Sequence, residues 1–325
     1  MKRRPLLLAA PLLAAGAARA QTARPGGWPE RALRLVVPFA PGGPSDIVAR
    51  ALAQRLSPAL GQPVVVENRA GGGGVVGTDA VAKAPPDGYT IGLCSAGALA
   101  IAPSLMPNLA YETLRDLAPV TLGVKVAEIL AVAPSLPVFT LGELIALAKR
   151  RPGGLNYATS GNGSMPHLAM ESLRFAAGIE VVHVPYRSGG QIVTSMLGGE
   201  TQMGFADLPI LLPQLRAGAL RPIVIGSEAR SPLFPEVPTT AEAGLPAVRA
   251  DNWHGFVAPG GTPPALVAAL RDAIAAALRS PALSQTLLDQ GAEPGGDTPQ
   301  EFAAFIKSET ARWGEVVRRA GIKPD

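Results

Sequence analysis

Short runs of aliphatic and β-branched residues alternate along this chain with longer stretches in which apolar side chains recur every three or four positions. The first pattern is typical of buried strands and the second of amphipathic helices. Because strands alternate with helices, the order predicts an α/β fold with a largely parallel sheet. The predicted strands are Leu33–Val37, Pro63–Glu67, Tyr89–Leu93, Pro119–Leu122, Ile129–Ala133, Leu155–Tyr157, Val181–Val184, Met203–Phe205, Leu220–Ile225 and Gly255–Ala258.

Three helix starts carry the capping-box pattern, in which a hydroxyl and an acid or amide three residues later satisfy each other's backbone N–H groups. These are Thr140–Glu143, Ser188–Gln191 and Thr298–Glu301. The last precedes an apolar stripe at helical spacing from Phe302 to Val317, which ends before Gly321. This stripe predicts a long C-terminal helix whose aromatic side chains pack on a core.

Two apolar segments that end in proline, Ile129–Pro134 and Trp253–Pro259, predict the points at which the chain passes between two lobes. A chain of 325 residues is long enough for two domains, each with its own core. Two crossings give one lobe made of 31–126 and 250–325 and a second lobe made of 127–249. The first lobe is therefore discontinuous in sequence.

The N-terminus has the pattern of an export signal, with basic Lys2–Arg4, apolar Leu6–Ala15 and the small-x-small sequence Ala18–Ala20. We expect residues 1–20 to be removed after export to the periplasm and residues 21–30 to form a linker. The adjacent arginines leave twin-arginine export open as an alternative to ordinary secretion. No later stretch reaches the roughly 20 uncharged apolar residues of a membrane span, so no stable membrane insertion is expected.

Charge and cysteine content narrow the possible partners. The signal carries four of the 29 Lys and Arg residues, which leaves 25 against 25 Asp and Glu. With no basic excess and 5% aromatic residues, nucleic acid is not expected as a partner.

Cys94 is the only cysteine and lies in an apolar run, so we expect a buried thiol and no disulfide within the chain. His167, His183 and His254 lack metal-site spacing, and no metal is expected.

Glycine-rich loops follow several of the predicted strands. Pro38–Asp46 (PFAPGGPSD) joins a strand to a helix and leaves backbone N–H groups directed at one spot, where an anion can bind. Ala158–Leu173 repeats this arrangement with hydroxyl and amide side chains, and Ser164 is its expected N-cap. Glu67–Gly77 contains G-x-G-x-x-G, but it lacks the acidic residue of a dinucleotide site, and no cofactor is expected.

Two further strand-end loops offer polar side chains. Arg187 is a possible partner for a ligand carboxylate or a plain surface residue, and Asp207 is a loop cap or an acceptor for a ligand amine or hydroxyl. Ser164 and His167 would be the nucleophile and base of a hydrolase, but the G-x-S-x-G elbow is absent from the chain.

Eight segments together resemble the substrate-binding proteins of tripartite tricarboxylate transporters, the Bug-type receptors. The resemblance covers essentially the whole mature chain. The segments are Pro38–Arg50, Val64–Gly74, Ala84–Thr90, Leu117–Thr121, Leu155–Ala169, His183–Gly190, Arg230–Pro246 and Phe256–Pro263.

The resemblance implies a two-lobed periplasmic-binding-protein-like fold of type II, with a ligand cleft between the lobes. It implies a monomeric receptor, not an enzyme, that holds a small carboxylate through loop backbone and water and delivers it to a two-subunit membrane permease. The ligand is then a di- or tricarboxylate, an amino acid or an aromatic acid. A secreted hydrolase and a ligand-sensing partner of a membrane sensor kinase remain as alternatives.

Carried over by position, the resemblance also implies a set of ligand contacts. From the first lobe they are Phe39, Gly42, Gly43, Ser45, Asp46, Ser95 and Gly97. From the second lobe they are Thr159, Ser160, Gly161, Asn162, Gly163, Ser164, His167, Tyr186 and Asp207. Because Asp46 would repel a carboxylate, we expect it to cap its own helix or bind a ligand amine, and Gly42 and Gly43 to contact the acid.

Overall fold

The computed structural model describes residues 25–42 and 44–323. The predicted signal peptide with its cleavage point, and the predicted ligand residue Gly43, lie outside the described residues. Within them, no helix is long and apolar enough to cross a membrane.

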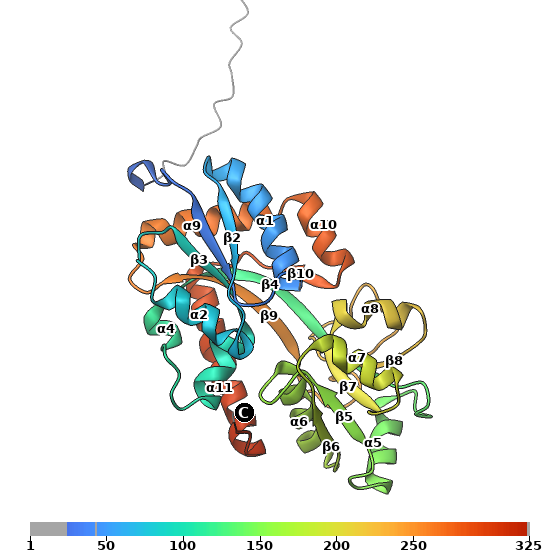
Figure 1. Ribbon diagram of the computed structural model, residues 1–325. Coiled ribbons are helices and arrows are strands. Elements are labelled where there is room, and N and C mark those ends of the chain that lie inside the picture. The colour runs from blue at the N-terminus through green and yellow to red at the C-terminus, as the bar shows by residue number, and fades with distance from the viewer. Residues whose placement is uncertain (1–24, 43, 324–325) are drawn as a thin grey trace, which may run out of the picture.

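The described strands form one ten-stranded mixed sheet, in which β8 and β10 pair with β4 beside the main path β2-β1-β3-β9-β4-β7-β5-β6 (Figure 1). The expectation of a largely parallel sheet is correct only toward its outer strands. β1 (Leu33–Val37) runs parallel to β2 (Val64–Asn68) and to β3 (Thr90–Ser95). The central strands β4 (Leu117–Val132) and β9 (Asp251–Pro259) are antiparallel to each other.

The long strand β4 joins two halves of this sheet. Residues 117–127 of β4 pair with β9, and residues 128–132 pair with β7 (Met203–Asp207) and β8 (Arg221–Ile225). We call the strands on the β9 side the first half and those on the β7 side the second half. The two strands predicted at Pro119–Leu122 and Ile129–Ala133 are therefore one strand of 16 residues.

Helices cover both faces of the first half, whose core joins β1, β3 and β9 to α1 and α9. The short strand β10 (Ala292–Pro294), which the sequence pattern did not predict, pairs with β4. The helices of this half are α1 (Pro44–Leu60), α2 (Val75–Ala82), α3 (Ala102–Leu105), α4 (Thr113–Asp116), α9 (Pro264–Leu278), α10 (Pro281–Asp289) and α11 (Pro299–Ala320). Single 3-10 turns lie at Pro25–Gly27 and Gly72–Gly74, and a π-helical turn spans Gly97–Ile101.

The second half repeats the layered arrangement on a smaller sheet. Here β5 (Asn156–Thr159) lies parallel to β6 (Val182–Pro185) and to β7. The core of this half is separate and includes Leu144, Tyr157 and Phe205. Its helices are α5 (Leu141–Arg150), α6 (Met165–Ala177), α7 (Gly189–Leu197) and α8 (Leu208–Arg216).

Helix α11 links the halves through a third cluster of buried residues. Phe302, Trp313 and Val317 pack with Met165 and Leu168 of α6 in this cluster. The end of α11 lies beside α6 in Figure 1. The predicted aromatic stripe is therefore core packing, as expected.

Two of the three predicted capping boxes are present, and one prediction is wrong. Thr140 and Thr298 each accept a hydrogen bond from the backbone N–H three residues on, and the glutamate at that position accepts one from the backbone N–H of the threonine. Ser188 is an N-cap without a side-chain bond, because Gln191 reaches past it to the N–H of Arg187 at 2.8 Å. Cys94 is buried as expected, and burial raises the pKa of its thiol to about 12.

Candidate functional site

Three of the predicted first-lobe residues surround a histidine that the sequence pattern did not single out, His254 on β9. Ser45 Oγ lies 2.9 Å from His254 Nε2, and the Phe39 ring meets the imidazole edge-on with centroids 6.0 Å apart. Ser95 stands opposite His254 in the β3–β9 ladder. Burial lowers the pKa of His254 to about 4, so the imidazole is neutral at pH 7.

Asp46 holds the first glycine loop together. Its carboxylate accepts from Arg50 Nε at 2.8 Å, from the Gly42 N–H at 2.9 Å and from Asn68 Nδ2 at 2.9 Å. The hydrogen bond from Arg50, followed by those from Gly42 and Asn68, lowers the pKa of Asp46 to about 2. None of these three bonds caps α1, so the expected cap of its own helix is not among the contacts of Asp46, and binding of a ligand amine stays a prediction. The Gly42 N–H, expected to face the ligand, donates to Asp46 here.

The loop after β3 adds Ser95 and Gly97 to this region. Ser95 is buried, and its Oγ accepts a 3.4 Å hydrogen bond from the Ala98 N–H. Gly97 begins the π-helical turn, a local geometry that often occurs at functional sites. A Cβ placed on Gly74 would lie 3.4 Å from both Phe39 Cζ and Ser95 Oγ, so these side chains converge on the second glycine loop.

The predicted second-half loop, Thr159 to Ser164, is tied to itself and to β6. Thr159 is fully buried, and its Oγ1 lies 2.6 Å from His183 Nε2. Ser164 is the N-cap of α6 as expected, but its hydroxyl donates to the Gly161 carbonyl at 2.7 Å instead of capping the helix. Ser160, Gly161 and Asn162 are half-buried.

His167 and Ser164 do not show the contact that a hydrolase needs. His167 Nδ1 accepts from the Gly163 N–H at 3.1 Å, while the Ser164 proton goes to a carbonyl. His167 instead stacks on His183 with ring centroids 3.9 Å apart, and His183 stacks on Tyr157 at 5.0 Å. These contacts give His167 a packing role within its own half.

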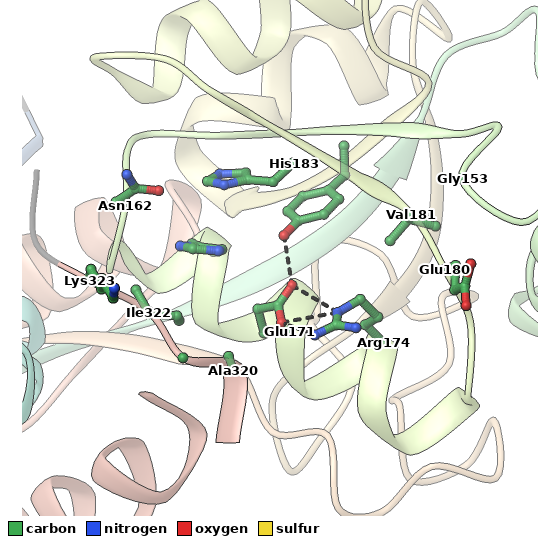
Figure 2. Close-up of a pocket in the computed structure, with 13 residues that line it drawn as sticks. Gly153, Asn162, Glu171, Arg174, Glu180, Val181, His183, Ala320, Ile322 and Lys323 are labelled. Atoms are coloured by element: carbon green, nitrogen blue, oxygen red, sulfur yellow. Dashed lines mark hydrogen bonds and ion pairs between the residues drawn. The ribbon is translucent and has the colours of Figure 1, made fainter. Parts of the chain in front are cut away.

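A cavity of about 650 Å³ opens beside this ring stack, between α6, β6 and the end of α11 (Figure 2). Tyr157 donates from its hydroxyl to Glu171 at 2.8 Å, and Glu171 is paired with Arg174 at 2.7 Å. Burial, followed by the Glu171 charge, raises the pKa of Tyr157. Two predicted ligand residues, Asn162 and His167, line this cavity.

Tyr186 lies on the other side of the Thr159 loop. Its N–H donates to the Thr159 carbonyl at 2.9 Å and its hydroxyl to Glu200 at 3.0 Å. The neighbouring Arg187 is exposed. A Cβ placed on Gly161 would lie 3.5 Å from the Tyr186 carbonyl oxygen. The structure thus brings Tyr186 together with Thr159 and Gly161.

Asp207, at the end of β7, meets the first-half residues. It lines a second cavity, about 30 Å³ in volume, with Ser45 and His254. The Asn252 amide donates to both of its oxygens at 3.0 and 3.2 Å. Burial raises the pKa of Asp207, while the hydrogen bonds from Asn252 lower it. One predicted residue from each lobe therefore faces the same small space.

The residues that the sequence pattern missed are partners supplied by other strands. His254 and Asn252 come from β9, His183 from β6 and Glu128 from β4. His183 and His254 stood in the sequence as isolated histidines, and the signal that could have found them was their place in strands flanking the glycine loops. Among the described residues, no group of three or more His, Cys, Asp or Glu side chains is placed to hold a metal ion.

Known sequences resemble this chain over nearly its whole length. The sequence model of the tripartite tricarboxylate transporter family receptor, TctC, matches residues 48–322. Protein BugT of Bordetella pertussis is 43% identical over 297 residues, which cover 91% of each chain. A Pseudomonas sp. protein encoded between tcbD and tcbE is 37% identical over 97% of this chain and 94% of its own.

Solved structures agree with the sequence relatives. The adipate complex of R. palustris Rpa4515 has a TM-score of 0.83 and 37% identity, over 92% of this chain and 100% of that one. MatC from Rhodopseudomonas palustris with bound malate has a TM-score of 0.79 and 33% identity, over 89% and 100%. The periplasmic binding protein BugD has a TM-score of 0.79 and 34% identity, over 91% and 99%. The chain therefore belongs to the tripartite tricarboxylate transporter receptor family, as the sequence motifs predicted.

Proposed function

We propose that this protein captures a small carboxylate between its two halves in the periplasm and delivers it to a two-subunit membrane permease. The observation that carries the proposal is the meeting of Ser45, in the first turn of α1 after the first glycine loop, with His254 and Asp207 at one cavity. Relatives of the same fold hold adipate and malate, which supports a small carboxylate as the ligand.

The proposed capture uses helix starts. The N-termini of α1 and α6 follow the two loops, and each N-terminus favours a negative charge by about 0.3–1 kcal/mol when exposed. Contacts of this size from both halves are needed for useful affinity. Exclusion of water on closure strengthens each of them, and the permease then recognises the closed form.

The proposed lobes are 31–126 with 250–325, and 127–249. The change of β4 partners from β9 to β7 between Ala127 and Glu128 supports the first boundary. In the proposed mechanism β4 and β9 are the strands that flex when the lobes close. We propose that the protein is a monomer. We also propose that residues 1–20 direct its export to the periplasm and are then removed.

A ligand panel tests the carboxylate proposal directly. We expect adipate, malate or another member of a panel of dicarboxylates, amino acids and aromatic acids to raise the melting temperature. At 100 times the dissociation constant, binding adds about 2.7 kcal/mol to the free energy of unfolding. If the whole panel leaves the melting temperature unchanged and native mass spectrometry finds no bound acid, the carboxylate proposal is wrong.

The proposal also states that no bond is made or broken. If the protein were a secreted hydrolase, Ser164→Ala would lose the ester turnover of the wild type. We expect no ester turnover in the wild type or in Ser164→Ala. Binding alone does not separate delivery to a permease from signalling to a sensor kinase. For that, the ligand-loaded protein is used to pull down its partner from solubilised membranes, and we expect the two permease subunits.

A further inference from the structure

A buried acidic group lies at the junction where β4 changes partners. Glu128 is fully buried, and neither carboxyl oxygen has a hydrogen-bond partner within bonding geometry among the described residues. It stands opposite Asp207 in the β4–β7 ladder. A buried, unpartnered carboxylate is strongly disfavoured as an anion, so this position needs a proton or a nearby positive charge.

Among the described residues, no basic side chain acts on the pKa of either acid, and Asp207 itself lies at the N-cap of α8, where a helix start favours a negative charge. On β8, the neighbour of Glu128 is Gly226, whose N–H donates to the Glu128 carbonyl at 2.8 Å. On β9, Asn252 gives Asp207 a neutral amide donor. His254 lines the Asp207 cavity as a neutral imidazole, because burial holds its pKa at about 4.

Three basic side chains act on a different acid of this region. Asp251, next along β9, has its pKa raised by burial to about 6. The charges that act on it are those of Lys125, Arg312, Arg249 and Glu293. Asp251 in turn adds to the negative potential at Glu128. Among the described residues, the side chains that act on the Glu128–Asp207 pair are thus a neutral donor, Asn252, and one further acid, Asp251.

The proton is best placed on Glu128. Burial and then the Asp207 charge raise the pKa of Glu128 well above its usual value. Asp207 is less buried and accepts twice from the Asn252 amide, which suits an ionised carboxylate. The two acids resemble other close carboxyl pairs that share one proton because both cannot ionise together.

We propose that Glu128 holds a proton against the Asp207 carboxylate, and that this proton sets the charge a ligand meets at the Asp207 end of the site. The inference rests on the proposed function, because it takes Asp207 to face the ligand. With the proton the pair carries one negative charge, and without it two. The second charge repels the far carboxylate of a dicarboxylate. Glu128 does not touch the ligand and acts through Asp207 as a positioning residue.

The test is the pH profile of dicarboxylate binding. We expect the Kd for adipate or malate, measured by calorimetry, to rise by up to tenfold per pH unit once the pair ionises, as for any single linked proton. Glu128→Gln keeps the shape but does not ionise, so it should bind as the wild type does at low pH and show no such slope. A flat wild-type profile, or an unchanged slope in Glu128→Gln, would overturn the proposal.

Two further measurements separate this inference from neighbouring effects. Asp251→Asn removes the acid with a pKa of about 6 and should leave the slope at higher pH in place. Without any ligand, the infrared spectrum at pH 7 should show the carbonyl band of a protonated carboxyl group that Glu128→Gln lacks. A band that persists in Glu128→Gln contradicts the proposal. If no acid binds at any pH, the proposed function fails, and the infrared result alone decides where the proton is.

Discussion

At the scale of single residues, the polar contacts that matter most for stability are buried ones. Glu309 on α11 accepts from the indole N–H groups of Trp253 and Trp313, each at 3.1 Å, and from Arg312 at 2.8 Å. Trp253 on β9 and Trp313 on α11 therefore share one acceptor, the Glu309 carboxylate. An unmade hydrogen bond at such a buried donor costs about 1–3 kcal/mol.

We expect Glu309→Ala to lower the free energy of unfolding by roughly 2–5 kcal/mol, because it leaves two buried indole N–H groups and a guanidinium without their acceptor. Urea denaturation followed by tryptophan fluorescence measures the loss. Glu315→Ala, an exposed position on the same helix, should change stability by less than about 0.5 kcal/mol. Equal losses in the two variants would show that the hydrogen bonds to Glu309 add no net stability.

Asp46 gives a prediction with a defined pH range. Its folded pKa of about 2 lies below the ordinary value of 3.8, so the ionised carboxylate stabilises the fold above that ordinary value. This contribution is lost as the pH falls from 3.8 toward 2. Asp46→Asn should therefore be less stable than the wild type at pH 7, and the difference should shrink on acidification through this range.

Denaturation at a series of pH values between about 3 and 7 checks this trend. Asp289→Asn, an exposed residue of α10, is the control and should differ little from the wild type at any pH. A difference for Asp46→Asn that stays constant down to pH 3 would mean that its carboxylate adds no pH-dependent stability.

At the scale of elements, capping chemistry was readable from sequence only where the local geometry allowed it. Thr298 and Glu301 exchange hydrogen bonds, at 3.2 Å for the Glu301 N–H and 2.8 Å for the Thr298 N–H. Ser188 has the same pattern, but Gln191 bonds the N–H of Arg187 instead. The sequence motif states which groups are available and does not fix which N–H the side chain reaches.

This difference predicts unequal effects of two similar substitutions. Thr298→Ala should lower the free energy of unfolding by about 1 kcal/mol, within the 0.5–2 kcal/mol range of N-cap losses. The reason is that the backbone N–H of Glu301 loses its acceptor, the Thr298 hydroxyl. Ser188→Ala should cost much less, since its hydroxyl caps nothing. Chemical denaturation of both variants provides the comparison, and a larger loss for Ser188→Ala would contradict the assigned bonds.

Strand positions were predictable and strand partners were not. Leu33–Val37 matches β1 residue for residue, because four of its five residues are aliphatic and buried, as in a strand covered on both faces. Strand β4 appeared as two strands, since Gly123, Lys125 and Glu128 interrupt its apolar pattern between Leu122 and Ile129. The three-residue strand β10 is too short to give a periodic signal.

At the scale of the whole molecule, the candidate site shows why sequence reasoning stopped where it did. The loop at Pro38–Asp46 was identifiable because strand, glycines and helix are consecutive in the chain. Its partner His254 lies 209 residues from Ser45, and only the antiparallel pairing of β3 with β9 brings them together. Glu128 and Asp207 meet for a similar reason, across the ladder of β4 and β7.

The contact between the halves also depends on a glycine whose role is visible only in the fold. Gly163 has φ +69°, and a Cβ there would lie 2.2 Å from Leu105 Cδ2 on α3. The second-half loop therefore presses directly on the first half at this point. Gly199 has a similar φ of +81° but no heavy atom within 4 Å of its ideal Cβ.

Alanine at either glycine should cost about 1–2 kcal/mol, because both positions have left-handed backbone. Only Gly163→Ala should also push the halves apart, which small-angle scattering would detect as a larger radius of gyration and calorimetry as weaker ligand binding. Leu105→Ala removes the clashing methyl groups and should restore the radius in the double variant without recovering the backbone cost. If Gly199→Ala changes the radius as much, or Leu105→Ala restores nothing, the Gly163–Leu105 contact does not set the distance between the halves.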